Sequence, residues 1–168
     1  MNIVLTGFMA SGKTEISKAA AKISGRLLID TDDLVVENEG MSINDIFAKY
    51  GEEYFRRAEH EAVKQAAKAE NAVIATGGGA VLNKANMDEL RKTGKIFNLS
   101  PDFEVIEERL AAAAATRPLL QNQDIESVRK RFNDRLPFYN DCDYKIHVTN
   151  GKSPQKYAEE ILRIMKES

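Results

Sequence analysis

An eight-residue segment near the start of the chain constrains its fold more than any other feature. Residues 7–14 read Gly-Phe-Met-Ala-Ser-Gly-Lys-Thr and fit G-x-x-x-x-G-K-[ST] at every fixed position. The short apolar run at residues 2–6 is typical of a buried strand, and the run that begins at Glu15 favours a helix. A strand, a glycine-rich loop and a helix in this order predict a loop that binds phosphate groups.

The fixed residues of this loop suit the phosphates of a nucleotide. Gly7 and Gly12 let backbone N–H groups approach an anion without a Cβ clash, and the following helix N-terminus adds partial positive charge. Lys13 can reach the β- and γ-phosphates, and the Thr14 hydroxyl can hold Mg²⁺. A glycine-rich turn without a ligand is the alternative.

Length and composition indicate one ordinary globular domain. The 168 residues are 43% hydrophobic and 30% charged, and a net charge of -2 gives no broad basic surface for nucleic acid. No apolar run is long enough to span a membrane, and a strand at residue 2 leaves no room for a signal peptide. Cys142 is the single cysteine, so no internal disulfide forms. We expect a cytoplasmic protein.

Short apolar runs alternate with helical patterns along the chain. We expect strands at residues 3–6, 27–30, 73–76, 95–99 and 144–148, and helices near 13–24, 43–69, 84–92, 102–114, 124–136 and 153–166. This alternation predicts an α/β fold whose parallel sheet has helices on both faces. The ligand site is then expected at the carboxyl ends of the strands.

Two aspartates follow the second expected strand. Asp30 and Asp32 flank Thr31, and in an extended segment both carboxylates would face the same way. One carboxylate could fix a Mg²⁺-bound water, and the other could orient or deprotonate an acceptor hydroxyl. The alternative is that Asp32 or Asp33 caps a helix beginning near Leu34.

A triple glycine and three arginines complete the candidate site. Residues 77–79 are all glycine, which indicates that the backbone approaches another group closely, with a tight turn as the alternative. Arg56, Arg117 and Arg135 carry planar guanidinium groups that suit carboxylates and phosphates, although each alone is more commonly a solvated surface charge. The five alanines at 111–115 favour a helix end, or alternatively a hinge.

Six motifs in this order make the chain similar to the shikimate kinase family over essentially its whole length. They are GFMASGKT at 7–14, DTD at 30–32, FRRAE at 55–59, GGG at 77–79, RPLL at 117–120 and RLPFY at 135–139. The resemblance implies a three-layer P-loop kinase fold with a five-stranded parallel sheet. It implies a single kinase domain at 1–168, a substrate-binding helical region at about 33–61 and a mobile lid at about 111–124.

The same resemblance implies a reaction and a role for each motif. A monomer would transfer the γ-phosphate of ATP to the 3-hydroxyl of shikimate, with Mg²⁺, in the route to aromatic amino acids. The nucleotide contacts would fall on Gly7, Ala10, Ser11, Gly12, Lys13, Thr14 and, at position 15, Glu15. The catalytic residues would be Lys13, Asp32 as candidate base, and Arg117 from the lid.

The remaining motif residues would bind the metal ion, the substrate or the adenine. Asp30 would hold Mg²⁺ through water, and Arg109 would stack on adenine. The shikimate carboxylate would be held by Arg56, which Glu59 positions, and by Arg135. Gly78 and Gly79 would offer backbone contacts to shikimate.

The sequence departs from the family pattern at two places, and two alternative functions remain open. Ala10 occupies a position where most members have glycine, and residues 111–115 are alanine where the lid usually has polar or charged residues. The alternatives are a related kinase acting on gluconate or a nucleotide, and a non-catalytic ATP-binding regulator. The triple glycine and the arginine pair favour a small hydroxy-carboxylate, and the D-x-D motif with the lid arginine argues against a regulator.

Overall fold

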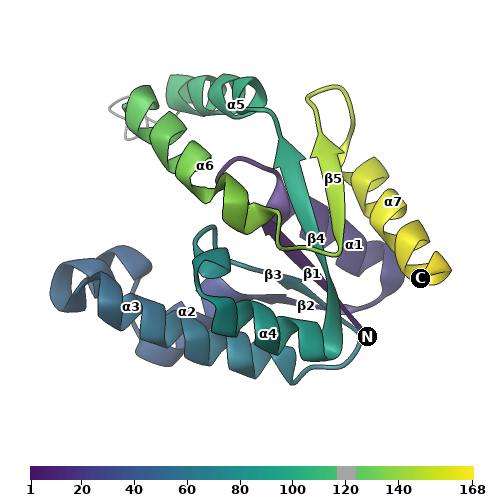
Figure 1. Cartoon of the computed structure of the whole chain (residues 1–168), viewed down its shortest axis with the longest axis horizontal. Coiled ribbons are helices and arrows are strands. Elements are labelled where there is room, and N and C mark those ends of the chain that lie inside the picture. Colours follow the sequence, from purple (N-terminus) through teal and green to yellow (C-terminus); the bar gives the residue numbers. More distant parts are fainter. Residues whose placement is uncertain (117–123) are drawn as a thin grey trace.

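One five-stranded parallel sheet organises the chain in the computed structural model, which describes residues 1–116 and 124–168 (Figure 1). The elements are, in chain order, β1 (Asn2–Gly7), α1 (Lys13–Ser24), β2 (Leu27–Asp30), α2 (Thr31–Glu39), α3 (Ile43–Ala67), β3 (Ala72–Ala75), the short 3₁₀ helix η1 (Ala80–Leu82), α4 (Lys84–Thr93), β4 (Gly94–Pro101), α5 (Phe103–Thr116), α6 (Ile125–Tyr139), β5 (Tyr144–Val148) and α7 (Pro154–Glu167). The strand order is β2-β3-β1-β4-β5, and every pairing is parallel. Within the two described ranges, no helix is both long and apolar enough to cross a membrane.

The central strand β1 supplies both core layers through its alternating side chains. Ile3 and Leu5 join one cluster with residues of α1 and α7. Val4 joins a second cluster with residues of α3, α4, α5 and α6 on the other face. All of β1 is buried, as a parallel strand covered on both faces requires. The predicted three-layer α/β fold is therefore confirmed.

The predicted strands and helices are confirmed with small shifts at their ends. The start of helix α2 differs from the expectation of an extended segment at residues 30–32 followed by a helix near Leu34. Helix α2 begins at Thr31, so residues 30–32 are not one extended segment. Its N-cap is Asp30, whose Oδ1 accepts from the backbone N–H of Asp32 at 2.8 Å and of Asp33 at 3.2 Å. The alternative, a cap at Asp32 or Asp33, is also wrong. Because β2 ends at Asp30 itself, that carboxylate already lies where the first helical turn needs an acceptor.

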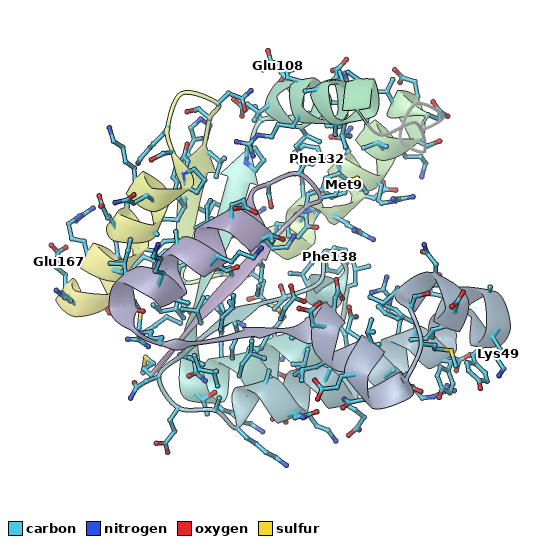
Figure 2. All side chains as sticks on the ribbon, turned by 180° about the vertical axis from the view of Figure 1, so that it is seen from behind. Met9, Lys49, Glu108, Phe132, Phe138 and Glu167 are labelled. Carbon is cyan, nitrogen blue, oxygen red and sulfur yellow. The ribbon has the colours of Figure 1, made fainter. Side chains whose placement is uncertain are left out.

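The long helix predicted near 43–69 is interrupted. Gly51 has φ 86° and ψ 176°, a left-handed backbone conformation that favours glycine, and it separates two helical segments within α3. Val35 of α2 packs on Ile46, Phe55 and Ala62 of α3 in a separate small core. The helical region expected at 33–61 thus corresponds to α2 and the first part of α3, and Lys49 lies at its outer end (Figure 2).

The alanine run forms the last turns of α5, so the expected helix end is confirmed over residues 111–115. The next described element is α6, which begins after the N-cap Asp124. Residues 117–123, half of the predicted lid at about 111–124, lie outside the described residues, and they include the catalytic candidate Arg117. The mobile lid therefore stays a prediction.

Candidate active site

The carboxyl ends of β1, β2 and β3 open into one cleft of about 490 Å³. The residues lining it come from the P-loop, the aspartate pair, the triple glycine and α6; they are Phe8, Met9, Ala10, Ser11, Gly12, Lys13, Thr14, Glu15, Asp30, Asp32, Ala75, Thr76, Gly77, Gly78, Gly79 and Arg135. The three strand ends that the sequence singled out therefore meet in space, as expected for a parallel sheet.

The P-loop is a tight turn closed by small residues. Gly12, at φ 96° and ψ 11°, precedes α1, and its carbonyl accepts from the N–H of Ile16 at 2.9 Å. Gly7 is needed for a different reason, because a Cβ there would lie 2.6 Å from Ser11 Oγ. On one flank, Phe8 packs edge-on against Phe132 of α6. Met9 packs against the same core, on the side of the loop that faces Phe132 (Figure 2). The loop is thus fixed by packing as well as by backbone geometry.

Ala10, the departure from the family pattern, adopts φ 60°, a left-handed conformation that is strained for any residue with a Cβ. We expect Ala10→Gly to leave stability unchanged or raise it by up to about 1 kcal/mol, because relief of this strain offsets the greater entropy of an unfolded chain with one more glycine. Urea unfolding measures this. The control is Ala48→Gly at an exposed helical position of α3, which should cost about 1 kcal/mol. Equal losses in the two variants would contradict the prediction.

The ammonium group of Lys13 lies inside the loop, where it donates to the carbonyl of Gly7 and, at 3.3 Å, to that of Phe8. Burial lowers the pKa of Lys13 from 10.5 to about 8, although the nearby carboxylates of Asp32 and Asp30 favour the charged form. The two aspartates only partly offset the cost of burying the Lys13 ammonium. A phosphate bound in the loop would add negative charge beside it and so favour its protonated form.

We therefore expect nucleotide affinity to fall as the pH rises above about 8. Below that pH Lys13 is already protonated, whereas above it binding must first add a proton, at a cost of up to roughly tenfold in affinity per pH unit. Calorimetric titration with ADP on either side of pH 8 tests this. Lys13→Met should bind more weakly throughout and lose this dependence. A wild-type affinity that stays constant across the range would contradict it.

The two aspartates lie in the cleft from different elements, Asp30 at the end of β2 and Asp32 in the first turn of α2. Burial raises the pKa of both carboxyl groups. The Asp30 carboxylate raises the pKa of Asp32 further, and the Lys13 ammonium opposes this. A carboxylate with a raised pKa is a better proton acceptor than an ordinary one, which suits the role predicted for Asp32.

The triple glycine makes room for the side chains of the site itself. A Cβ at Gly77 would lie 2.6 Å from Asp32 Oδ1, and one at Gly79 would lie 2.5 Å from Arg56 Nη1. At Gly78 the nearest atom would be Arg135 Nη1, at 3.4 Å. None of the three glycines has a left-handed φ. The predicted close approach is thus to Asp32 and Arg56, which explains why positions 77 and 79 lack side chains, whereas a Cβ at position 78 would make an ordinary contact.

The Arg56 guanidinium is held from behind by Glu59, as the i, i+3 spacing predicts. The two side chains form an ion pair at 2.9 Å, and Glu59 is only 1% exposed. Burial raises the pKa of Glu59, while the Arg56 charge opposes the rise. A second carboxylate, that of the exposed Glu52, lies 3.6 Å from Arg56 Nη2 and makes only a weak surface pair. Because a guanidinium carries five N–H donors, Arg56 retains donors for a further anion beside Gly79.

Two side chains whose roles the sequence did not reveal hold the triple glycine in place. The Tyr139 hydroxyl donates to the carbonyl of Gly78 at 2.7 Å, and the N–H of Gly77 donates to Thr31 Oγ1 at 3.2 Å. Both residues are buried. Thr31 is the middle residue of D-T-D and Tyr139 is the last residue of R-L-P-F-Y. Both therefore belong to motifs visible in the sequence, but spacing cannot show which atom a hydroxyl contacts.

Arg109, predicted to stack on adenine, lies beside the P-loop rather than in the lining of the cleft. Its Nη1 donates to the carbonyl of Ala10 at 2.8 Å, and its Nε donates to Asn150 Oδ1 at 2.9 Å. It therefore connects the loop to the segment after β5. Its contact with adenine stays a prediction.

The oxygen ligands available in the cleft fit Mg²⁺. The Thr14 hydroxyl and the Asp30 carboxylate both line it, and Asp30 uses Oδ1 for the helix cap, which leaves Oδ2 for a ligand. Among the described residues there is no group of three or more His, Cys, Asp or Glu side chains placed to hold a metal ion. Such a sparse donor set suits Mg²⁺, which is commonly held by one or two protein ligands together with phosphates and water.

A family model and similar curated relatives point to the same family. The family model described as shikimate kinase matches residues 9–166. A shikimate kinase from Caldanaerobacter subterraneus is 47% identical over 163 residues, which cover 96% of this chain and 94% of the relative.

Solved structures give the same result. A shikimate kinase from Acinetobacter baumannii in complex with shikimate is 32% identical with a TM-score of 0.86, covering 99% of this chain and 93% of that one. A shikimate kinase from Bacteroides thetaiotaomicron is 29% identical with a TM-score of 0.88, covering 99% and 98%. With the P-loop, aspartate pair and triple glycine meeting in one cleft, these similarities establish that the chain belongs to the shikimate kinase family.

Proposed function

We propose that this cleft transfers the γ-phosphate of ATP to the 3-hydroxyl of shikimate, releasing ADP and shikimate 3-phosphate. The observation that carries the proposal is that Asp32, Arg56 and Arg135 each face one glycine of the triple glycine, next to the P-loop. A carboxylate that can accept a proton and two guanidinium groups that can hold an anion thus lie beside three consecutive residues, with Asp32 and Arg135 in the cleft lining and Arg56 next to it at Gly79. A hydroxy-carboxylate acceptor matches this set of groups.

The P-loop residues bind and orient the nucleotide. Backbone N–H groups near Gly12 and the N-terminus of α1 face the phosphates, and the Lys13 ammonium neutralises charge on the β- and γ-phosphates. Mg²⁺, held by Thr14 and through water by Asp30, supplies further charge neutralisation when it is bound. Phosphoryl transfer requires little covalent chemistry from the protein, so positioning and charge account for most of the catalysis.

The acceptor is held on the opposite side of the cleft. Arg56 and Arg135 bind its carboxylate, and the backbone at Gly78 and Gly79 contacts its ring substituents. Asp32 accepts a hydrogen bond from the reacting hydroxyl and takes its proton as the O–P bond forms. Arg117 of the predicted lid would add positive charge at the transferring phosphoryl group, and Arg109 would stack on the adenine. Closure of that lid would exclude water and limit hydrolysis of ATP.

Several broader properties are also part of the proposal. We expect the enzyme to act as a monomer in the cytoplasm, in the pathway that produces aromatic amino acids. Its ligands are ATP, Mg²⁺ and shikimate, and we expect neither nucleic acid nor a membrane as a partner.

A coupled assay of ADP release tests the proposed function. The purified protein is given ATP and Mg²⁺ with shikimate, gluconate, a nucleoside monophosphate or no acceptor. We expect rapid turnover with shikimate alone. Turnover with gluconate or a nucleotide instead would favour a related kinase. Turnover that does not depend on an acceptor, or no turnover at all, would overturn the kinase assignment.

A further inference from the structure

The side chain of Asn86, on α4, is fully buried although it lies outside the cleft lining. An amide buried without partners costs free energy, so its contacts are informative. Its Nδ2 donates to the carbonyl of Ala80 at 3.0 Å, and its Oδ1 lies 2.7 Å from Nδ1 of His60. None of the proposed catalytic steps uses this group.

The chemistry of the two partners fixes the direction of both hydrogen bonds. A backbone carbonyl can only accept, so the amide nitrogen of Asn86 must face Ala80. The amide oxygen then faces His60, whose Nδ1 must carry a hydrogen. Nδ1–H is present in one neutral tautomer and also in the protonated ring, so the connection does not require a change in histidine charge.

The two ends of this connection adjoin two neighbouring groups of the proposed acceptor site, the triple-glycine turn and Arg56. Ala80 directly follows Gly79, and its N–H donates to the carbonyl of Gly77 at 3.1 Å, closing the triple-glycine turn. His60 directly follows Glu59, which holds Arg56. The Arg56 guanidinium lies so near Gly79 that even a methyl group would not fit between them. A small displacement of α3 from this turn would therefore move the carboxylate-binding arginine.

We propose that Asn86 and His60 are positioning residues for the acceptor, which together set the separation between α3 and the triple-glycine turn. The inference rests on the proposed function, because it concerns the site for the shikimate carboxylate. It assigns no contact with substrate to either residue. The effect passes through Arg56 on one side and Gly79 on the other.

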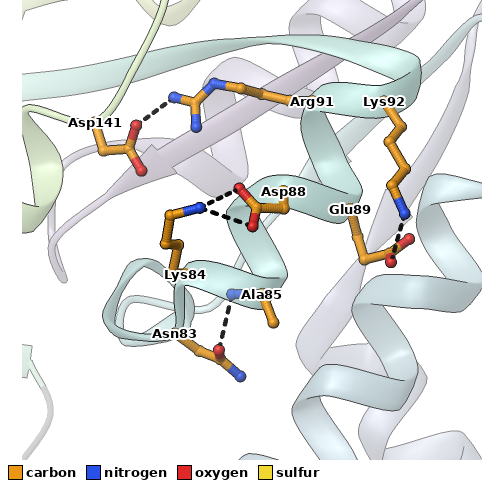
Figure 3. A network of polar contacts seen from close by, with 8 residues as sticks. All are labelled: Asn83, Lys84, Ala85, Asp88, Glu89, Arg91, Lys92 and Asp141. Atoms are coloured by element: carbon orange, nitrogen blue, oxygen red, sulfur yellow. Dashed lines mark hydrogen bonds and ion pairs between the residues drawn. The ribbon is translucent and has the colours of Figure 1, made fainter.

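The helix α4 is stabilised and held against the core without Asn86, since its Met87 and Leu90 are fully buried there, so variants are expected to fold. Asn83 caps the helix by accepting from the N–H of Ala85 at 3.0 Å, and Lys84 pairs with Asp88 at 2.9 Å (Figure 3). Near the other end, Arg91 pairs with Asp141 of the segment before β5 (Figure 3). These contacts remain when the bond between Asn86 and His60 is removed.

The test compares His60→Leu, which removes the donor, with His60→Asn, whose amide nitrogen can replace Nδ1. We expect His60→Leu to raise the KM for shikimate by roughly three- to tenfold, the effect of one neutral hydrogen bond, with the KM for ATP unchanged. His60→Asn should restore most of the affinity. The matched control is His147→Leu at the exposed second histidine, on β5, which should change neither constant.

Asn86→Leu and the double variant His60→Leu/Asn86→Leu complete the cycle, and the double variant should raise the KM for shikimate no more than Asn86→Leu alone. The inference would be overturned if His60→Leu left the KM for shikimate unchanged or raised the KM values for shikimate and ATP equally. It would also be overturned if His60→Asn did not restore the affinity for shikimate. Wild-type protein that does not turn over shikimate would overturn the proposed function together with it. If the wild-type protein turns over shikimate normally and a variant gives one of the contradicting results above, this inference alone is overturned and the proposed function stands.

Discussion

Asp32→Asn is expected to lower kcat by about a thousandfold while changing nucleotide affinity little, which is the middle of the range for loss of a general base. The amide has nearly the same shape and can accept a hydrogen bond, but it cannot take up the proton of the acceptor hydroxyl. The carboxylate lies in the cleft close enough to Gly77 that a Cβ there would be 2.6 Å from its Oδ1. Steady-state kinetics with shikimate and calorimetric titration with ADP measure the two effects separately.

Asp33→Asn is the matched control, because Asp33 is the exposed neighbour in the same turn and does not line the cleft. Its kcat should stay close to that of the wild type. In the wild type, the acidic limb of the kcat profile should lie above the ordinary range of an aspartate, since burial and Asp30 raise the pKa of Asp32 and activity needs the ionised form. Wild-type kcat in Asp32→Asn would remove Asp32 from the role of base.

Gly77→Ala and Gly79→Ala are expected to produce different kinetic defects, although they lie two residues apart. The new methyl at 77 would displace the Asp32 carboxylate, so kcat should fall. The methyl at 79 would lie within 2.9 Å of three atoms of the Arg56 guanidinium, so the KM for shikimate should rise. Losing a hydrogen bond to a charged group costs about 1.5–3 kcal/mol, or roughly 10- to 100-fold in each constant.

Both side chains can move aside, so these variants are expected to fold and the defects to be kinetic. Gly151→Ala is the control, because a Cβ there meets no atom within 4 Å and the backbone is not left-handed. Its kinetic constants should match the wild type. The same defect in both variants, or a loss of stability that accompanies the kinetic changes, would show that the triple glycine serves the fold and not the individual side chains.

Much of the fold could be predicted because its strands are short apolar runs separated by strong helical patterns. β1 is buried on both faces around an apolar run at residues 3–5, and the ends of β1, β2 and β3 carry distinctive groups. The error at α2 arose where two local signals competed. An Asp-Thr-Asp sequence fits an extended strand end and a helix cap equally well, and only the position at which β2 stops decides that Asp30 is the cap.

Local patterns in the chain are enough to predict the parallel α/β fold, the P-loop and the residue types of the acceptor site, because period, glycine spacing and charge are local properties. The tertiary structure alone decided which atoms meet: that Gly77 and Gly79 make room for Asp32 and Arg56, that Tyr139 binds the Gly78 carbonyl, and that Asn86 joins α3 to the turn. These contacts join residues far apart in the chain. Their distances depend on how the helices pack against the sheet, which no local pattern encodes.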